Sequence, residues 1–277
     1  MNNYDKIVEL YHRFGDREED LKIFYANDYP IPYKNLKLFP VQVDLYYYFH
    51  ILVQCLLIPH KTSGDAKAIS MSYLKYLCYL ATEKQQPEYI TFLSDLLLIV
   101  LKKEEKYIDE YGKEKYTLEI NLDAGTIQIE NEIYNSKDFD KIKNIILEQN
   151  ALEPLDETIN PELLKAFRER EEYMYKQSKV KLASFEDQIN IVVAKSSYRR
   201  DEIVRMTIRS FSRLLQRIDK IMDYSIKSIL LPYMDDKGKK NIDHYLSNTD
   251  KTLKEKCESM FTDMNTLKKK VEGNNMG

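Results

Sequence analysis

The feature that most constrains the fold of this 277-residue chain is its scarcity of residues that interrupt regular structure. Only 7 glycines and 8 prolines occur. Glycine and proline most often supply turns and end helices, so the regular elements should be long. A sandwich or barrel needs many short strands with turns between them, and the sequence therefore predicts a mainly α-helical fold. A hydrophobic fraction of 43% is enough for a substantial core, in one large domain or two smaller ones.

One segment departs from the helical pattern. Between about residues 116 and 130, apolar and polar side chains alternate, and the turn residues 123–125 divide the segment in two. Alternation with a period of two is typical of strands that bury one face, and two such runs around a short turn indicate a β-hairpin. We therefore expect helical, bundle-like N- and C-terminal parts with one inserted β-hairpin. The proline-containing segment Tyr29–Pro40 should also be extended.

Apolar residues spaced by three and four predict the helices. The expected ranges are 4–14, 41–58, 69–82, 87–103, a helix from 136, a very polar one over 162–181, a short one from 185, a long one from 207 and a shorter one around 242–246. Ser184 with Asp187 resembles a capping box, and Thr207 can cap the long helix. Residues 198–203 should turn the chain between the short helix from 185 and the long helix from 207.

The prolines Pro154 and Pro161 mark the best candidate boundary in the chain. The expected organisation is an N-terminal helical domain with the hairpin (1–150), a polar helical connector (151–183), a C-terminal helical module (184–248) and a weakly helical, lysine-rich tail (249–277).

No pattern of catalytic, cofactor-binding or metal-binding residues is visible. The four histidines are scattered without a second His or Cys at ligand spacing, and His50, in an apolar run, should be a core histidine. The seven glycines never cluster into a phosphate-binding loop. We therefore expect a protein that is not an enzyme, with no cofactor and no metal.

Charge and apolar runs exclude further classes. The net charge of −3 gives no general electrostatic reason to bind nucleic acid. No apolar run reaches the roughly 20 residues of a membrane span, and no signal peptide is expected at the N-terminus. Three widely spaced cysteines suggest no disulfide framework and favour a reducing cytoplasm.

Four arginines recur every fourth residue, which would place them along one side of the long helix: Arg205, Arg209, Arg213 and Arg217. Like charges at this spacing destabilise an isolated helix by a few tenths of a kcal/mol per pair, so something should compensate. Internal acidic groups such as Asp201, Glu202 or Asp219 offer one explanation. An acidic partner helix offers another, because guanidinium groups suit carboxylates, and phosphate binding is a third. These four residues are the candidate partner-binding site.

The chain also has 22 tyrosines and no tryptophan. Codon usage in a genome rich in A and T would explain this bias. The alternative is that tyrosine supplies rigid, amphipathic contact area at protein interfaces.

The C-terminal string FEDQINIVVAKSSYRRDEIVRMTIRSFSRLLQRIDKIMDYSI resembles a small helical module encoded in tail-gene clusters of bacteriophages and prophages of low-GC Gram-positive bacteria. In that module a helix, an aromatic turn segment, a Met-Thr pair and a long helix follow in this order. The strings IPYKNLKLFPVQVDLYYYF and ISMSYLKYL are similar to the opening of proteins from the same clusters. The hairpin around residues 116–130 has no counterpart in the module.

The resemblance implies a non-enzymatic role in the host cell cytoplasm or in the virion. Products of such clusters are tail-assembly chaperones, which hold the tape-measure protein, or structural proteins of the tail and baseplate. The expected partners are therefore other phage tail proteins, namely the tape-measure, tube or baseplate proteins. The resemblance supplies no catalytic residues, and the sequence does not give the oligomeric state.

Overall fold

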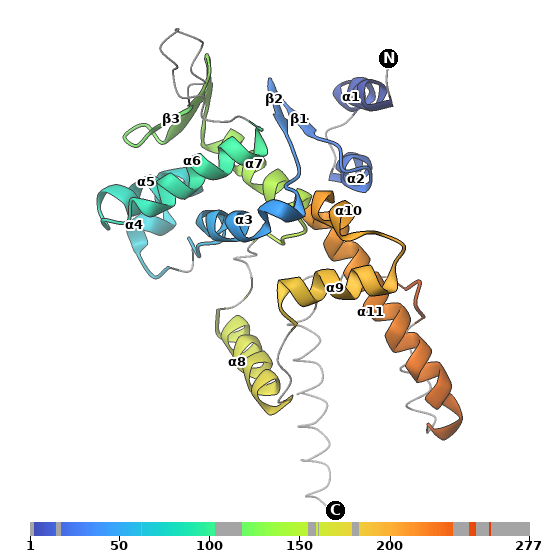
Figure 1. Cartoon of the computed structure of the whole chain (residues 1–277). Coiled ribbons are helices and arrows are strands. Elements are labelled where there is room, and N and C mark those ends of the chain that lie inside the picture. The colour runs from blue at the N-terminus through green and yellow to red at the C-terminus, as the bar shows by residue number, and fades with distance from the viewer. Residues whose placement is uncertain are drawn as a thin grey trace, which may run out of the picture. The chain divides into compact units, whose positions relative to one another are not determined.

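In the computed structural model the chain is mainly helical with two small antiparallel sheets, as the sequence predicts (Figure 1). The structure describes residues 3–14, 18–61, 63–102, 118–154, 159, 161–178, 183–234, 244–247 and 255. The chain divides into two compact units, and each unit contains two separate stretches of sequence. Unit 1 consists of residues 1–154 and 199–212, and unit 2 consists of residues 155–198 and 213–277.

Unit 1 begins with two helices, α1 (Asn3–Phe14) and α2 (Glu18–Ala26), and an antiparallel hairpin of β1 (Ile31–Tyr33) and β2 (Leu36–Leu38). The hairpin confirms the extended segment, which folds back on itself at Lys34, where φ is +50°. The alternating leucines Leu36 and Leu38 are buried on one face of β2. The helix α2, of nine residues, was not predicted from the sequence.

The single helix predicted over residues 41–58 is wrong. The segment forms η1 (Val43–Leu45), α3 (Tyr46–Leu52) and η2 (Val53–Leu56), and Gln42 before them is extended with ψ of 158°. Gln42 pairs as an isolated bridge with Thr207. Tertiary pairing of the backbone therefore overrides the local helical pattern at the start of this segment.

The core of unit 1 lies among α5 (Tyr73–Thr82), α6 (Glu88–Val100) and α7 (Ser136–Gln149), with the short α4 (Ala66–Ile69) beside them. Fully buried side chains from these helices fill it: Leu74, Leu77, Leu93, Leu96, Leu97, Phe139, Ile142 and Ile146. The helix predicted over 69–82 starts later, at residue 73, because the chain is extended at Ser72. The cap of α7 is Asn135, with Asp138 completing a capping box.

The described part of the predicted hairpin is confirmed by β3 (Leu118–Asn121) and β4 (Thr126–Ile129), and the structure adds a third strand, β5 (Glu132–Tyr134). Residues 116 and 117 lie outside the described part of the chain. In the turn between β3 and β4, the Asn121 side chain accepts hydrogen bonds from the backbone amides of Asp123 and Ala124, and Gly125 has φ of +62°. Ile127, Ile129 and Tyr134 bury one face of the sheet.

Unit 2 contains α8 (Pro161–Ser178) and α9 (Phe185–Lys195), which confirm the predicted polar helix and its successor. The capping box at the start of α9 is present, since Asp187 N donates to Ser184 Oγ (3.1 Å) and Ser184 N donates to Asp187 Oδ2 (3.1 Å). The described residues 244–247 form a turn rather than the predicted helix. The predicted lysine-rich tail lies outside the described residues apart from Glu255.

Candidate interaction surface on helix α11

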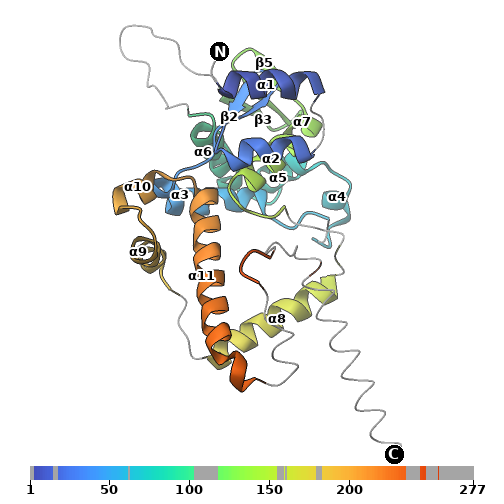
Figure 2. The ribbon, with the colours of Figure 1, turned by 90° about the vertical axis from the view of Figure 1, so that its right-hand side faces the viewer.

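The long C-terminal helix, α11 (Ile208–Leu230), begins at a sharp break from the short α10 (Arg200–Arg205) (Figure 2). Met206, between them, is extended, with ψ of 159°. Its carbonyl accepts from Val43 N (2.9 Å), and Ile208 N donates to the carbonyl of Val41 (2.8 Å). The prediction of a simple turn at 198–203 is therefore wrong in detail, because residues 200–205 are helical. Arg205 also lies on α10 instead of sharing α11 with the other arginines.

Thr207 caps α11, as predicted, and binds Asp28 within unit 1. The hydroxyl accepts from Ser210 N (3.1 Å) and donates to Asp28 Oδ1 (2.7 Å). The Ser210 hydroxyl donates to Asp28 Oδ2 (2.7 Å). Both carboxylate oxygens of Asp28 are thus used to hold the first turn of α11, which explains why residues 199–212 belong to the same compact unit as residues 1–154.

Arg209 makes internal contacts within unit 1. Its guanidinium lies 4.7 Å from the centre of the Tyr25 ring and donates to the backbone carbonyl of Glu148. The Tyr25 hydroxyl donates to the Glu148 carboxylate (2.7 Å). Burial, followed by this hydrogen bond, raises the pKa of Tyr25. The arginine therefore forms part of a packed cluster beside the end of α7.

In unit 2, the basic side of α11 is covered by a turn of the same chain. Arg217 donates to the backbone carbonyl of Tyr245 (2.7 Å), and Lys220 donates to the hydroxyl and carbonyl of Ser247 (2.7 and 2.9 Å). The Tyr224 ring packs against the rings of His244 and Tyr245 at 5.3 and 5.4 Å. Arg209 and Arg217 thus each donate to a backbone carbonyl of the same chain, which differs from the pairing with acidic side chains considered from the sequence. Arg205 and Arg213 have exposed side chains, and a partner-binding role of the four stays a prediction.

The apolar side of α11 is buried at the start of the helix and open at its end. At 100° per residue, a single stripe, within about 40° of Met222 around the helix axis, contains Ile208, Phe211, Leu215, Ile218, Met222, Ile226 and Ile229. The exposed fraction rises from 3% at Phe211 and 9% at Ile218 to 40% at Met222, 55% at Ile226 and 73% at Ile229. We call Met222, Ile226 and Ile229 the distal stripe. The long helix predicted from residue 207 contains these residues, but its sequence could not show which of them are left uncovered.

A second open apolar surface lies on unit 1, along η1 and α3. Leu45, Tyr47, Tyr48 and Ile51 are between 41% and 65% exposed. Other tyrosines, such as Tyr73 and Tyr134, are buried in the core. Tyrosine therefore serves both the interior and the surface of this protein, and its abundance alone does not identify an interface.

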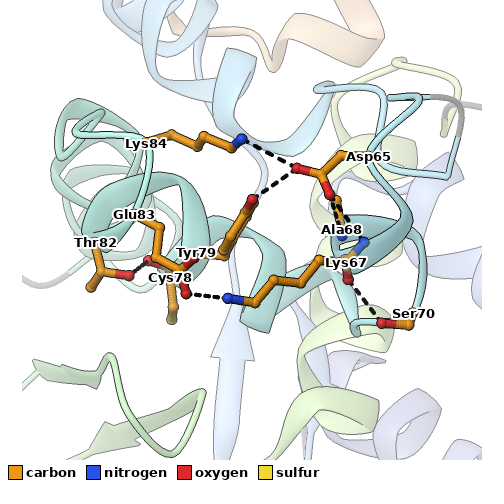
Figure 3. Close-up of polar contacts among 9 residues, drawn as sticks. All are labelled: Asp65, Lys67, Ala68, Ser70, Cys78, Tyr79, Thr82, Glu83 and Lys84. Carbon is orange, nitrogen blue, oxygen red and sulfur yellow. Dashed lines mark hydrogen bonds and ion pairs between the residues drawn. The ribbon is translucent and has the colours of Figure 1, made fainter.

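A polar network in unit 1 surrounds Asp65, between α4 and α5 (Figure 3). The Asp65 carboxylate caps α4 through Lys67 N (3.0 Å), accepts from the Tyr79 hydroxyl (2.8 Å) and pairs with Lys84 Nζ (3.2 Å). The hydrogen bond from Tyr79, followed by that from Lys84, lowers the pKa of Asp65 to about 2. Because the oxygens of Asp65 are occupied by structural donors, the network supports the fold of this corner.

The prediction that His50 lies in the core is wrong, because His50 is exposed and stacks on Tyr46. The buried histidine is His60, whose Nε2 lies 2.8 Å from the carbonyl of Ala68 and whose ring stacks on Tyr76. Among the described residues, no group of three or more His, Cys, Asp and Glu side chains is arranged to hold a metal ion. None of the described helices is both long and apolar enough to cross a bilayer.

The capped α9, the α10–α11 break and the long amphipathic α11 together define a small helical module. Residues 176–250, which contain these elements, match the family model described as the YomV second domain, a protein family of a Bacillus prophage region. The match covers less than half of the chain. No curated protein and no solved structure matches the chain.

Proposed function

We propose that this chain is a non-enzymatic prophage protein that acts by binding another protein, as an assembly factor or chaperone for a phage tail. The tape-measure protein is the proposed partner. The observation that carries the proposal is the open distal stripe of α11, where three large apolar side chains in line are 40% to 73% exposed. Contiguous exposed apolar surface on a soluble protein commonly marks an interaction site.

The shape of this surface favours a helical partner. The distal stripe continues the seam that is buried at Phe211 and Ile218, so it has the spacing that receives a second amphipathic helix. The match of residues 176–250 to a prophage-region family supports a role in a phage particle or its assembly.

Co-expression with the tape-measure protein of the same prophage tests the proposal. We expect the two proteins to elute together in size-exclusion chromatography at micromolar concentration. The variant Ile226→Glu with Ile229→Glu should lose the partner, because burying two new carboxylates against apolar side chains is unfavourable. Ile133→Glu on β5, where the side chain is 64% exposed, is the matched control and should keep it. Co-elution that survives the double substitution would refute the assignment of this surface.

The alternative is a structural subunit of the tail or baseplate. A second open surface at η1 and α3 favours it, because a subunit inside a particle contacts neighbours on more than one side. Mass spectrometry of purified virions separates the two roles. Stoichiometric amounts of the chain in the particle would support the subunit, and its absence from particles would support the chaperone.

A further inference from the structure

The distal stripe of α11 has different charges on its two flanks. On one flank, at about 60° and 100° from Met222 around the helix axis, lie Asp219 and Asp223. The other flank carries no charged residue within about 120° of Met222, and Leu214, Ile221, Ser225 and Ser228 lie there. An incoming helix therefore meets carboxylates on one side of the apolar seam and no charge on the other.

The two carboxylates are accessible. Asp219 and Asp223 are both exposed, and among the described residues no hydrogen bond or ion pair engages Asp219. Asp223 pairs with Lys227 one turn further along the same helix at 2.6 Å. An exposed pair of this kind contributes little to stability, so a partner's cation can replace or share it.

The basic residues of α11 lie on the opposite side of the helix. Arg213, Arg217, Lys220 and Lys227 are all about 140° or more from Met222. Two of them, Arg217 and Lys220, are already engaged by the turn at residues 244–247. Part of the basic side is thus covered by the chain itself, whereas the apolar side is open and has an acidic edge.

From this arrangement we propose that the distal stripe binds an amphipathic helix whose apolar seam is flanked by lysine or arginine. The inference rests on the proposed protein-binding function and specifies the partner's chemistry at the same surface. Residues next to the seam of paired helices select partners by charge. This partner differs from the acidic helix considered for the arginine series, which lies on another side of α11.

A second copy of this chain fits less well. In an antiparallel pair of α11 helices, like flanks face each other, so the carboxylates of one copy meet those of the other. In a parallel pair the acidic flank meets the uncharged one. Neither arrangement offers complementary charge to Asp219 and Asp223 at the seam.

The test uses two synthetic helical peptides with the same leucine and isoleucine seam, one flanked by lysines and the other by glutamates. Binding to the full-length chain is followed by fluorescence anisotropy. We expect the lysine peptide to bind about threefold to tenfold more tightly at low salt, the effect of one or two exposed ion pairs. The difference should shrink in 0.5 M sodium chloride, because salt screens exposed charges.

Charge reversal provides the decisive variant. Asp219→Lys with Asp223→Lys should remove or invert the preference, whereas Glu169→Lys with Glu172→Lys on the exposed surface of α8 makes the same charge change elsewhere and should keep it. Equal affinity for the two peptides, no binding of either, or a preference unaffected by the α11 reversal would overturn the proposal. So would light scattering that showed a dimer dissociated by Ile226→Glu.

The two levels of the hypothesis fail differently. If Ile226→Glu with Ile229→Glu leaves the phage partner bound, the surface itself is wrongly assigned. If that variant releases the partner but charge reversal of Asp219 and Asp223 has no effect on peptide preference, the surface is right and the basic partner is wrong.

Discussion

Thr207→Val tests how residues 199–212 are held against the N-terminal stretch within unit 1. The substitution keeps a branched side chain of similar size and removes the hydroxyl that accepts from Ser210 N and donates to Asp28. Losing a helix N-cap costs about 1 kcal/mol, and losing a hydrogen bond to an ionised group costs about 1.5–3 kcal/mol. Because Asp28 is only partly buried, water replaces part of the second contribution. We expect a local destabilisation of about 2–3 kcal/mol.

Amide hydrogen exchange is the appropriate assay, because two compact units need not unfold in a single step. A loss of about 2–3 kcal/mol corresponds to exchange about 30-fold to 150-fold faster, since 1.4 kcal/mol is a factor of ten. The effect should appear in peptides that contain Val43, Ile208 and Phe211, whose amides donate within this junction. Ser210→Ala removes only one hydrogen bond to Asp28 and should have a smaller effect.

Ser225→Ala is the control on the same helix. Its hydroxyl is exposed and bonds only to the carbonyl of Ile221 one turn back, so its removal should change stability by less than about 0.5 kcal/mol. Exchange near Val43 that is unchanged in Thr207→Val, or equally accelerated in Ser225→Ala, would refute the inferred anchor.

Two further predictions concern single side chains. Asp65 has a folded pKa of about 2, below its unfolded value near 3.8, so its contribution to folding stability is present above pH 4 and is lost as the pH falls from 4 towards 2. Over this pH range the urea midpoint should fall more steeply in the wild type than in Asp65→Asn. Equal slopes would contradict a stabilising role of the Asp65 charge. Burial raises the pKa of Cys55 to about 12 and also raises the pKa of Cys78. A thiol reagent at pH 8 should therefore label both cysteines far more slowly in the native protein than in urea. Rapid labelling of Cys55 in the native protein would contradict its burial.

Local sequence patterns predicted the structure correctly where it depends on residues that are close together in the sequence. The capping box at Ser184, the Thr207 cap and the alternation over residues 118–129 each involve groups within a few positions of one another. The third strand β5 was missed because Glu132–Tyr134 is short and follows directly on β4. The helix predicted from residue 41 begins later because Gln42 pairs with Thr207, a contact that periodicity does not encode.

Only part of the candidate surface on α11 could be predicted from the sequence. Met222, Ile226 and Ile229 share one face of the predicted long helix, but they were not singled out from the sequence, which could not show that this face is open. The arginine series drew attention to the other side of α11. That side is occupied by the turn at residues 244–247 through contacts to Arg217 and Lys220, which no local pattern predicts.

The junction at Asp28 and Thr207 has a consequence for the order of events during synthesis. Its partners are 179 residues apart, so a nascent chain that has emerged only to Pro154 lacks the segment that completes unit 1. Residues 206–210 supply the hydrogen-bond partners of three groups in the N-terminal stretch: the carbonyl of Val41, the amide of Val43 and the Asp28 carboxylate. Closing so long a loop carries an entropic cost and slows folding. The last step of unit 1 therefore follows the emergence of residues 199–212, and a fragment ending before residue 199 would leave that edge unpaired.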